Sequence, residues 1–326
     1  MILKKKLFMD TNNNLAPLSG DASFRKFYRK KNSVLVYCKK DRKKNLLIYD
    51  AINKILIKNK LKAPKLIRQS YKKNFIEIED LGNESLYKKL RKKKNSKIKY
   101  YKKIIYLLYR LQKIKTKKTK TFVNSNYKVP LYSKQKLFDE SNLFLEWYIP
   151  KVIKKKKQKK LRRKLKNIIK RLLNNLKNKN DVFVHRDFHV SNLMNYKNNI
   201  AILDNQDAVY GNSAYDLASL IDDVRLKTSR DFKKKIFEYF LKITKCKNTK
   251  IFKNDFDILS VLRNIKIIGI FTRLSVRDKK HSYLNLIPHA WQLIEHRINN
   301  NEIFKDLKFF LDHHFTKNIR IKKWKK

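Results

Sequence analysis

The stretch VFVHRDFHVSNLMNYKNNIAILD, residues 182–204, decides how the rest of the chain is interpreted. Residues Leu193–Tyr196 and Ile200–Leu203 have the composition of two short strands, with turn-forming residues between them. A hairpin closed there brings Asn192 and Asp204 side by side at its open end. Both side chains offer oxygen, and Mg²⁺ is usually held by one or two protein carboxylates together with substrate phosphates. The sequence therefore predicts a magnesium-phosphate site at these two residues.

Asp187 lies one loop turn upstream and can accept a proton from an attacking hydroxyl group. The order His-Arg-Asp, four residues, Asn and then Asp is the arrangement of the catalytic loop and metal ligands in protein kinases. Asp187 is thus the expected catalytic base, and Asn192 and Asp204 are the expected metal ligands. Arg186 either steadies the loop or forms a structural ion pair. Asp216 either caps a helix or holds the catalytic loop.

The chain carries a large basic excess, with 83 Lys and Arg against 27 Asp and Glu and a formal net charge of +56. Such an excess usually indicates nucleic acid or an anionic membrane as partner. Here it is spread over nearly the whole chain and accompanies abundant Asn, Ile, Phe and Tyr, whose codons are rich in A and T. A biased genome is a sufficient cause, so we expect no specific nucleic-acid partner.

Cysteine and histidine usage gives no sign of a metal centre. Cys38 and Cys246 are far apart in the sequence, which predicts a reducing compartment without a disulfide framework. His189, His281 and His289 have no metal-like grouping and are expected to be structural or surface residues. No run approaches the roughly 20 apolar residues that span a bilayer, and none near Met1 has signal-peptide length. We expect a cytoplasmic protein with no transmembrane segment.

The N-terminal part has strand character and the rest is mainly helical. Residues 23–29 and 33–38 predict a hairpin, the apolar spacing from Leu46 to Leu61 predicts a helix, and Phe75–Glu79 predicts a further strand. Apolar residues at helical spacing predict the remaining elements. These are expected at Leu86 to about Lys115, Lys154 to Lys179, about Asp231 to Thr244, about Asp255 to Leu274, Leu284 to Asn299 and Phe304 to His314.

The segment from Lys154 to Lys179 looks like a basic arm for nucleic acid, but its apolar residues mark one face of a single helix, so its lysines form a solvated face. The expected fold class is therefore α+β. Residues 1–82 would form a small N-terminal nucleotide-binding lobe with a sheet. Residues 83–326 would form a larger, mainly helical C-terminal lobe for catalysis and substrate binding.

Three blocks resemble the aminoglycoside-phosphotransferase and choline-kinase superfamily, and within it the bacterial N-acetylmuramate/N-acetylglucosamine anomeric kinases of cell-wall sugar recycling. They are GDASFR at 20–25, the stretch 184–219, and the stretch 262–278 with its GIFTRL sequence. EDLG at 79–82 resembles the family's lobe hinge, and FLEWY at 144–148 resembles a segment of its helical lobe. The resemblance covers nearly the whole chain.

The resemblance implies a two-lobed protein-kinase-like fold, ATP and Mg²⁺ as cofactors, and phosphorylation of the anomeric hydroxyl group of an N-acetylated amino sugar. It implies the same roles for Asp187, Asn192 and Asp204 as the spacing does. The nucleotide-binding residues that it implies are Gly20, Asp21, Ala22, Ser23, Arg25, Glu79 and Leu81. Its candidates for the sugar pocket, which could equally form ion pairs between helices, are Glu146, Asp207, Arg273 and Arg277.

The chain departs from the family pattern at two points. Asn205 replaces the Phe expected after the metal-binding Asp, and no lysine is clearly placed on the second strand to pair the phosphates, where Lys39 and Lys40 are the candidates. The acceptor also stays open. A kinase for an aminoglycoside or choline is one alternative, and a non-catalytic protein that binds nucleic acid or a membrane on a kinase fold is another.

Two features weigh on these alternatives. A cationic acceptor needs acidic pocket residues, and the helical part offers few. A neutral or anionic sugar is therefore favoured, and the surplus of lysines suits the lactyl carboxylate of N-acetylmuramate. The intact set of Asp187, Asn192 and Asp204 argues against a protein without turnover.

Overall fold

The computed structural model describes residues 15–18, 25–92, 97–197, 199–322 and 324. The chain divides into two compact units. Unit 1 consists of Met1–Lys92, Ile114–Val129 and Val190–Ala208, and unit 2 consists of Lys93–Lys113, Pro130–His189 and Val209–Lys326. The expectation of a nucleotide-binding domain that ends at residue 82 stays a prediction.

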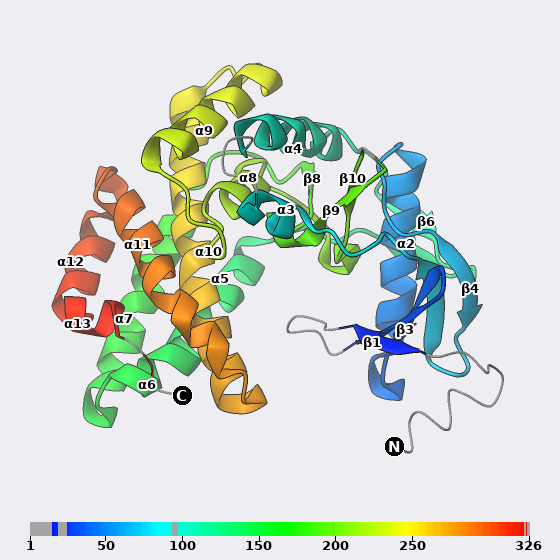
Figure 1. Cartoon of the computed structure of the whole chain (residues 1–326). Coiled ribbons are helices and arrows are strands. Elements are labelled where there is room, and N and C mark those ends of the chain that lie inside the picture. Colours follow the sequence, from blue (N-terminus) through cyan, green and yellow to red (C-terminus); the bar gives the residue numbers. More distant parts are fainter. Residues whose placement is uncertain (1–14, 19–24, 93–96, 198, 323, 325–326) are drawn as a thin grey trace. The chain divides into compact units, whose positions relative to one another are not determined.

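Unit 1 is built on a five-stranded antiparallel sheet with the strand order β1-β2-β3-β5-β4 (Figure 1). Its strands are β1 (Ala16–Leu18), β2 (Lys26–Lys30), β3 (Ser33–Tyr37), β4 (Leu66–Ser70) and β5 (Phe75–Glu79). The structure confirms the predicted hairpin, which is β2 and β3, and the predicted strand β5. The sequence reasoning did not predict the edge strands β1 and β4.

Helix α2 (Lys44–Lys58) confirms the helix expected from the apolar spacing, and it closes the core of the sheet. Val36 and Cys38 from the β3 side, Ile76 of β5, and Leu46 and Tyr49 of α2 belong to one buried cluster. Each has at most 3% of its surface exposed. Alternate residues of a strand face the same side of a sheet, so this side meets the apolar stripe of the helix.

A second hairpin in unit 1 consists of β9 (Leu193–Tyr196) and β10 (Asn199–Ile202). It confirms the predicted hairpin, although its second strand begins one residue earlier than expected. Met194 and Ala201 from its two strands pack against Leu81. The other elements of unit 1 are η1 (Lys40–Arg42), α3 (Leu86–Lys92), β6 (Lys118–Lys120), β7 (Asn126–Lys128), η3 (Val190–Asn192) and η4 (Asn205–Asp207).

Unit 2 is organised around the 30-residue helix α10 (Thr249–Asp278), yellow to orange in Figure 1. The Asn248 side chain caps its start by accepting a hydrogen bond from the Ile251 backbone, and Lys279 ends it in a left-handed conformation. These two caps make the helix longer than the expected span from Asp255 to Leu274. Twenty of its residues are buried, because α5, α8 and α11 pack around it.

The remaining helices of unit 2 include the helices expected there, together with several that the sequence did not predict. They are α4 (Lys97–Gln112), α5 (Lys134–Leu143), the π-helix η2 (Phe144–Tyr148), α6 (Ile149–Val152), α7 (Lys155–Asn174), α8 (Ala214–Ile221), α9 (Arg230–Thr244), η5 (His281–Leu286), α11 (Ile287–Ile298), η6 (Glu302–Phe304), α12 (Lys305–His314) and α13 (Lys317–Arg320). Helix α7 buries its apolar face and exposes its lysines, as predicted, but it ends at Asn174 instead of Lys179. Two short strands, β8 (Val182–Val184) and β11 (Val209–Gly211), pair beside these helices.

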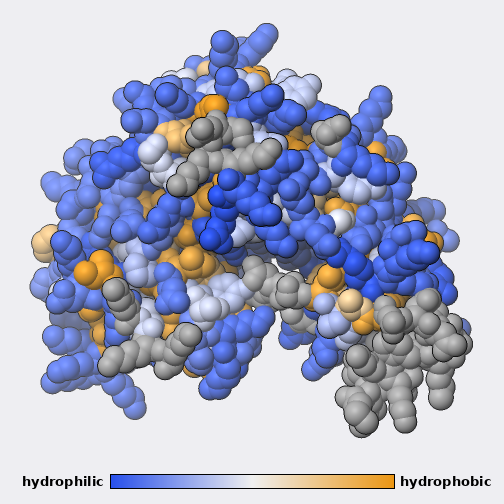
Figure 2. All heavy atoms as spheres, viewed as in Figure 1, coloured by the Kyte–Doolittle hydropathy of each residue, from blue (hydrophilic) through white to orange (hydrophobic). Residues whose placement is uncertain are grey.

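The surface reflects the composition of the chain. The face drawn in Figure 2 is mostly hydrophilic, with small and scattered apolar areas. Within the described residues, no helix combines the length and the apolar character needed to cross a membrane. Cys38 is buried and Cys246 is half-buried, and both are free thiols.

Candidate active site

The loop that carries Asp187 begins where β8 ends, and a buried aspartate holds its backbone. Asp216 of α8 has 0% of its surface exposed. Its carboxylate accepts the backbone N–H of His185 at 2.6 Å and that of Arg186 at 3.0 Å. Arg186 has a positive φ of 75°, which is uncommon for a residue with a side chain. Asp216 therefore holds the turn before Asp187 in place, which was one of its two expected roles.

Asp187 presents an ionised carboxylate that stays partly open to solvent, since 42% of its side chain is exposed. Loss of solvent around it raises its pKa. The positive charges of Lys266 and Arg263 outweigh that effect and hold the pKa well below its usual range. The Arg263 Nη2 atom lies 4.0 Å from its Oδ1 atom. At neutral pH the carboxylate can thus accept a hydrogen bond from a hydroxyl group, which orients that group.

A buried charge network surrounds Arg186, and the sequence reasoning did not assign it to the site. The Lys266 Nζ atom lies 2.9 Å from Glu140 Oε2. Arg186 pairs with the other oxygen of the same carboxylate, and the Tyr132 hydroxyl group donates to Oε2. Arg186 therefore both belongs to the loop and forms an ion pair. Glu140 and Lys266 come from α5 and α10, far from residue 187 in sequence, so no local spacing could have indicated them.

In unit 1, the ends of the β9–β10 hairpin meet as predicted. The Leu203 backbone N–H donates to the Asn192 carbonyl group at 2.9 Å. Asp204 follows with a positive φ of 60°, and 42% of its side chain is exposed. Its Oδ1 atom accepts Arg25 Nη2 at 2.5 Å and Gln206 Nε2 at 3.1 Å.

The residue after Asp204 has a clear packing role. The Asn205 side chain, 0% exposed, donates from Nδ2 to Asn53 Oδ1 of α2 at 2.9 Å and to the Ile202 carbonyl group at 3.0 Å. The amide therefore fixes this turn by hydrogen bonds. A phenylalanine, the residue expected here, would have to do so by packing alone.

Asn192 and Asp204 are the two residues on this side that the sequence predicts as ligands of a divalent cation. Asn192 carries an amide oxygen and Asp204 a carboxylate, and both kinds of donor suit Mg²⁺. Among the described residues, no three His, Cys, Asp or Glu side chains gather as a metal cage. A magnesium ion held by Asn192 and Asp204 would therefore take its further ligands from phosphate oxygens and water.

The structure describes only some of the expected nucleotide-binding residues. Gly20, Asp21, Ala22 and Ser23 lie outside the described residues. Arg25 is buried beside Asp204. Glu79 pairs with Lys62 at 2.6 Å and accepts the Tyr196 hydroxyl group at 3.1 Å, while Leu81 packs under the second hairpin. Their contact with a nucleotide stays a prediction.

Three of the four sugar-pocket candidates lie in unit 2 and affect one another electrostatically. Burial lowers the pKa of Arg273, the charge of Arg277 lowers it further, and the charge of Glu146 counteracts both. Glu146 accepts Asn142 Nδ2 at 2.6 Å, and Arg277 donates to its neighbour Asp278 at 2.7 Å.

The fourth candidate, Asp207, belongs to unit 1. It is exposed and accepts Gln206 Nε2 at 3.0 Å. Burial and the charge of Asp207 together raise the pKa of Tyr127 to about 12.

Four cations follow one face of α10, and we call them the α10 row: Arg263, Lys266, Arg273 and Arg277. At 3.6 residues per turn these positions fall within roughly 80° of one another around the helix axis. Arg263 and Lys266 lie beside Asp187 and are 3% and 8% exposed, whereas Arg277 is exposed. The row therefore runs from the catalytic loop toward the surface of unit 2.

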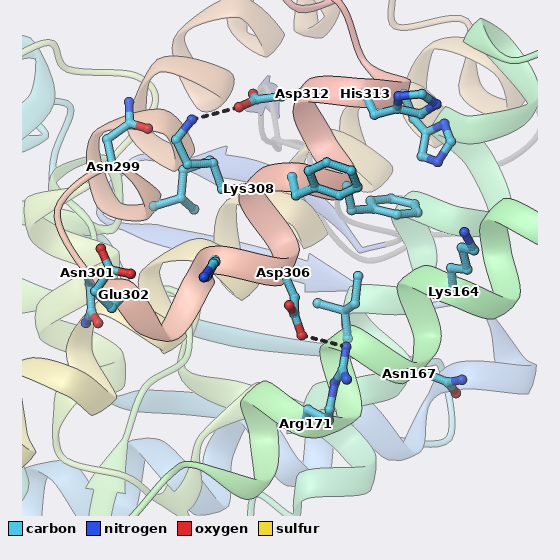
Figure 3. Close-up of a pocket in the computed structure, with 16 residues that line it drawn as sticks. Lys164, Asn167, Arg171, Asn299, Asn301, Glu302, Asp306, Lys308, Asp312 and His313 are labelled. Carbon is cyan, nitrogen blue, oxygen red and sulfur yellow. Dashed lines mark hydrogen bonds and ion pairs between the residues drawn. The ribbon is translucent and has the colours of Figure 1, made fainter.

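A hollow of about 1300 Å³ lies between α7 and α12 and does not coincide with the candidate active site (Figure 3). It is lined by side chains of both charges, including the ion pair of Arg171 with Asp306 at 2.9 Å and that of Lys308 with Asp312 at 2.8 Å. None of the residues expected in the active site lines it.

Comparisons with known proteins identify the family and show similar proteins. Residues 14–245 match the model of a family described as phosphotransferase enzyme family. An N-acetylmuramate/N-acetylglucosamine kinase of Neisseria meningitidis serogroup B is 30% identical over 166 residues, which cover 49% of this chain and 50% of that protein. A protein of the same name from Pseudomonas aeruginosa is 26% identical over 302 residues, covering 86% of this chain and 82% of that protein.

A solved structure with a similar fold is the crystal structure of the ADP-bound aminoglycoside phosphotransferase APH(2'')-Ib. The two structures align with a TM-score of 0.60 at 17% sequence identity, and the alignment covers 93% of this chain and 97% of the phosphotransferase chain. This likeness confirms the expected α+β, protein-kinase-like fold.

Proposed function

Because the chain belongs to the phosphotransferase enzyme family, we propose that it transfers the γ-phosphoryl group of ATP to the anomeric hydroxyl group of N-acetylmuramate or N-acetylglucosamine. Transfer of phosphate to a hydroxyl group of an acceptor is the reaction expected of this family. The identity of the sugar is our further proposal, and the names of the two relatives support it. The structural observation that supports a sugar acceptor is the position of Asp187 at one end of the α10 row. A cytoplasmic location, where ATP is available, fits this function.

Asp187 is proposed to orient the acceptor hydroxyl group and to take its proton. Phosphoryl transfer needs positioning and charge neutralisation more than covalent chemistry. A carboxylate that Lys266 and Arg263 keep ionised is a weak base before reaction. It can still receive the proton as the oxygen loses electron density to phosphorus. The hydrogen bonds from the loop to Asp216 keep it in place for this step.

Asn192 and Asp204 are proposed to hold the magnesium ion. Bound there, Mg²⁺ would supply the positive charge that draws electron density from the phosphate oxygens. The backbone hydrogen bond between Leu203 and Asn192 supports this proposal, since it fixes the two donor residues at neighbouring positions of the hairpin.

The α10 row is proposed to bind the sugar. Arg263 Nη1 and Arg273 Nε are buried, and neither has a hydrogen-bond partner within the part of the chain that the structure describes. A buried donor without a partner is costly, so an acceptor that offers oxygens would stabilise both. Four cations repel an amino-group acceptor and attract a carboxylate. This charge favours N-acetylmuramate, with its lactyl carboxylate, over an aminoglycoside or choline.

An acceptor panel tests the proposal. The purified protein is incubated with ATP and Mg²⁺ and, separately, with N-acetylmuramate, N-acetylglucosamine, choline or kanamycin, while ADP release is followed. Asp187→Asn serves as the blank. Release with the two sugars that disappears in the blank supports the proposal. Release with choline or kanamycin alone would keep the kinase and reject the sugar.

Arg273 separates the two sugars. In Arg273→Gln, the KM for N-acetylmuramate should rise more than the KM for N-acetylglucosamine, because only the former carries a carboxylate. Lys250→Gln, an exposed lysine in the first turn of the same helix, is the matched control. Equal changes in KM for both sugars would mean that Arg273 does not bind the lactyl carboxylate.

A further inference from the structure

Arg25 is a buried cation at the candidate phosphate site. Its side chain is 2% exposed, and no other basic residue of unit 1 is buried among those that the structure describes. Its Nη2 atom lies 2.5 Å from Asp204 Oδ1 and its Nη1 atom 2.7 Å from Gln206 Oε1. The guanidinium group thus contacts one of the two expected metal ligands and the residue that donates to the same carboxylate oxygen.

The cation that protein kinases use for the phosphates is missing from its usual place. Those enzymes carry a lysine on the third strand that pairs with phosphates and with a glutamate of the following helix. Here β3 reads SVLVY and contains no basic residue. The two candidates beyond it, Lys39 and Lys40, are exposed. On α2, the buried Asp50 pairs with Lys54 of its own helix at 2.8 Å.

The surroundings of Arg25 connect helix α2 to the turn that carries Asp204. The guanidinium carbon lies 5.1 Å from the ring centre of Tyr49, a residue of α2, and 5.5 Å from that of Phe27. Asn53, one turn further along α2, accepts the hydrogen bond from Asn205. Helix α2 is thereby connected to the turn that follows β10 at two points, through Arg25 and through Asn205.

We propose that Arg25, from the start of β2, is the cation that neutralises the nucleotide phosphates and orients Asp204 in this chain. A guanidinium group stays charged at all physiological pH values and offers five N–H donors in a planar fork, so it can serve a carboxylate and a phosphate together. The proposal rests on the proposed function only in that nucleotide phosphates bind at Asp204. It is independent of the acceptor.

Nucleotide affinity without any acceptor tests it. Calorimetric titration of the full chain measures the Kd for ADP and for adenosine, each with Mg²⁺ and with EDTA. In Arg25→Gln the Kd for ADP should rise about tenfold or more, because a charged hydrogen bond to phosphate is lost. The Kd for adenosine should stay within about twofold, and Arg25→Lys should recover part of the ADP affinity.

The matched control is Arg68→Gln. Arg68 lies in the same sheet and pairs with Glu77 at 3.2 Å, but its side chain is 56% exposed. It should leave both affinities unchanged. An equal loss of ADP and adenosine binding in Arg25→Gln, or no loss of either, would overturn the proposal, because a residue that merely supports the fold does not distinguish phosphate from adenosine.

A second variant covers the case in which Arg25→Gln does not fold. In Asp204→Asn, the charge of Arg25 is no longer offset, so ADP should bind more tightly than to the wild type in EDTA. An unchanged or weaker affinity in EDTA would contradict the proposal. Failure of the sugar assignment looks different: the ADP pattern above would persist while the acceptor panel showed no turnover with either sugar.

Discussion

Two aspartates of unit 2 are each held against a pair of cations, but in different ways. Asp222, at the end of α8, has a side chain that is 0% exposed and lies 2.9 Å from Lys233 Nζ and 2.8 Å from Arg297 Nε. Asp187 is 42% exposed, and Arg263 comes only to 4.0 Å. In both, partial or full burial raises the pKa of the carboxyl group, and the neighbouring cations more than reverse that effect.

The difference is the one expected between a structural carboxylate and the catalytic base that we propose for Asp187. Asp222 also accepts the Ser260 hydroxyl group at 2.6 Å, so its two oxygens join side chains of α9, α10 and α11. Its hydrogen-bonding capacity is directed into the protein. Asp187 carries the same ionised group, but a substantial part of it faces solvent, where an acceptor hydroxyl group can reach it.

The largest expected effect is on activity at Asp187. Replacing it with asparagine removes the proton acceptor, so kcat should fall by about 10² to 10⁴-fold. The melting temperature should change little, since 42% of the side chain is exposed and Arg263 lies 4.0 Å from its carboxylate. Steady-state kinetics and thermal unfolding of the same preparation check both parts. A variant that keeps more than about half of its kcat would remove Asp187 from the chemistry.

The reverse pattern is expected at Asp222. Asp222→Asn removes the buried carboxylate that pairs with Lys233 and leaves Arg297 paired with Asp257 at 3.5 Å. Breaking a buried ion pair typically costs about 3 to 5 kcal/mol of unfolding free energy. Urea unfolding at pH 7 measures this cost. The kcat of the folded fraction, measured well below the melting temperature, should stay near the wild-type value. A stable variant with low kcat would show that the comparison assigns the two aspartates the wrong way round.

Acid denaturation should show how strongly the folded protein stabilises the ionised Asp222. The folded pKa of Asp222 is depressed below its ordinary value of 3.8, so its stabilising contribution is present above about pH 4 and is lost as pH falls below that. One proton changes the unfolding free energy by about 1.4 kcal/mol per pH unit in this range. Wild-type stability should thus fall more steeply than that of Asp222→Asn between pH 4 and pH 2.5. Parallel curves would mean that Asp222 is not strongly paired.

A third aspartate provides the smallest effect. Asp306 pairs with Arg171 at 2.9 Å, but both side chains are more than 60% exposed. Water already solvates both groups, so Asp306→Asn should change the unfolding free energy by less than about 1 kcal/mol. Urea unfolding beside Asp222→Asn gives the direct contrast. A loss as large as that of the buried pair would refute exposure as the deciding variable.

The sequence predicted those parts of the fold that short-range patterns encode. The β9–β10 hairpin follows from two apolar runs around turn residues, and α7 follows from its apolar spacing. Strands β1, β8 and β11 have three residues each, which is too short for alternation to be recognised. Strand β4 reads LIRQS and is largely exposed, so it lacks an apolar pattern.

The candidate site residues also fall into those that a short sequence pattern predicts and those that only tertiary packing brings together. Asp187, Asn192 and Asp204 lie within one short stretch, so their spacing was informative. Glu140 and Lys266 meet only because α10 packs closely on α5 and the π-helix.

Gly269 makes this packing possible. A Cβ atom there would collide with the backbone of Leu143 and Phe144. The sequence shows the glycine but not its neighbour, which depends on tertiary packing.

The carbon that carries the transferred phosphate shows whether the anomeric hydroxyl group is the acceptor. ³¹P NMR of the product formed from N-acetylmuramate, ATP and Mg²⁺ shows which hydroxyl group was phosphorylated, since the coupling of phosphorus to the sugar protons differs between carbon 1 and carbon 6. We expect a sugar 1-phosphate with the wild-type protein and with folded Asp222→Asn, and no detectable product from Asp187→Asn within the same reaction time. A phosphate on another carbon, or the same product at a comparable rate from Asp187→Asn, would contradict the proposed function.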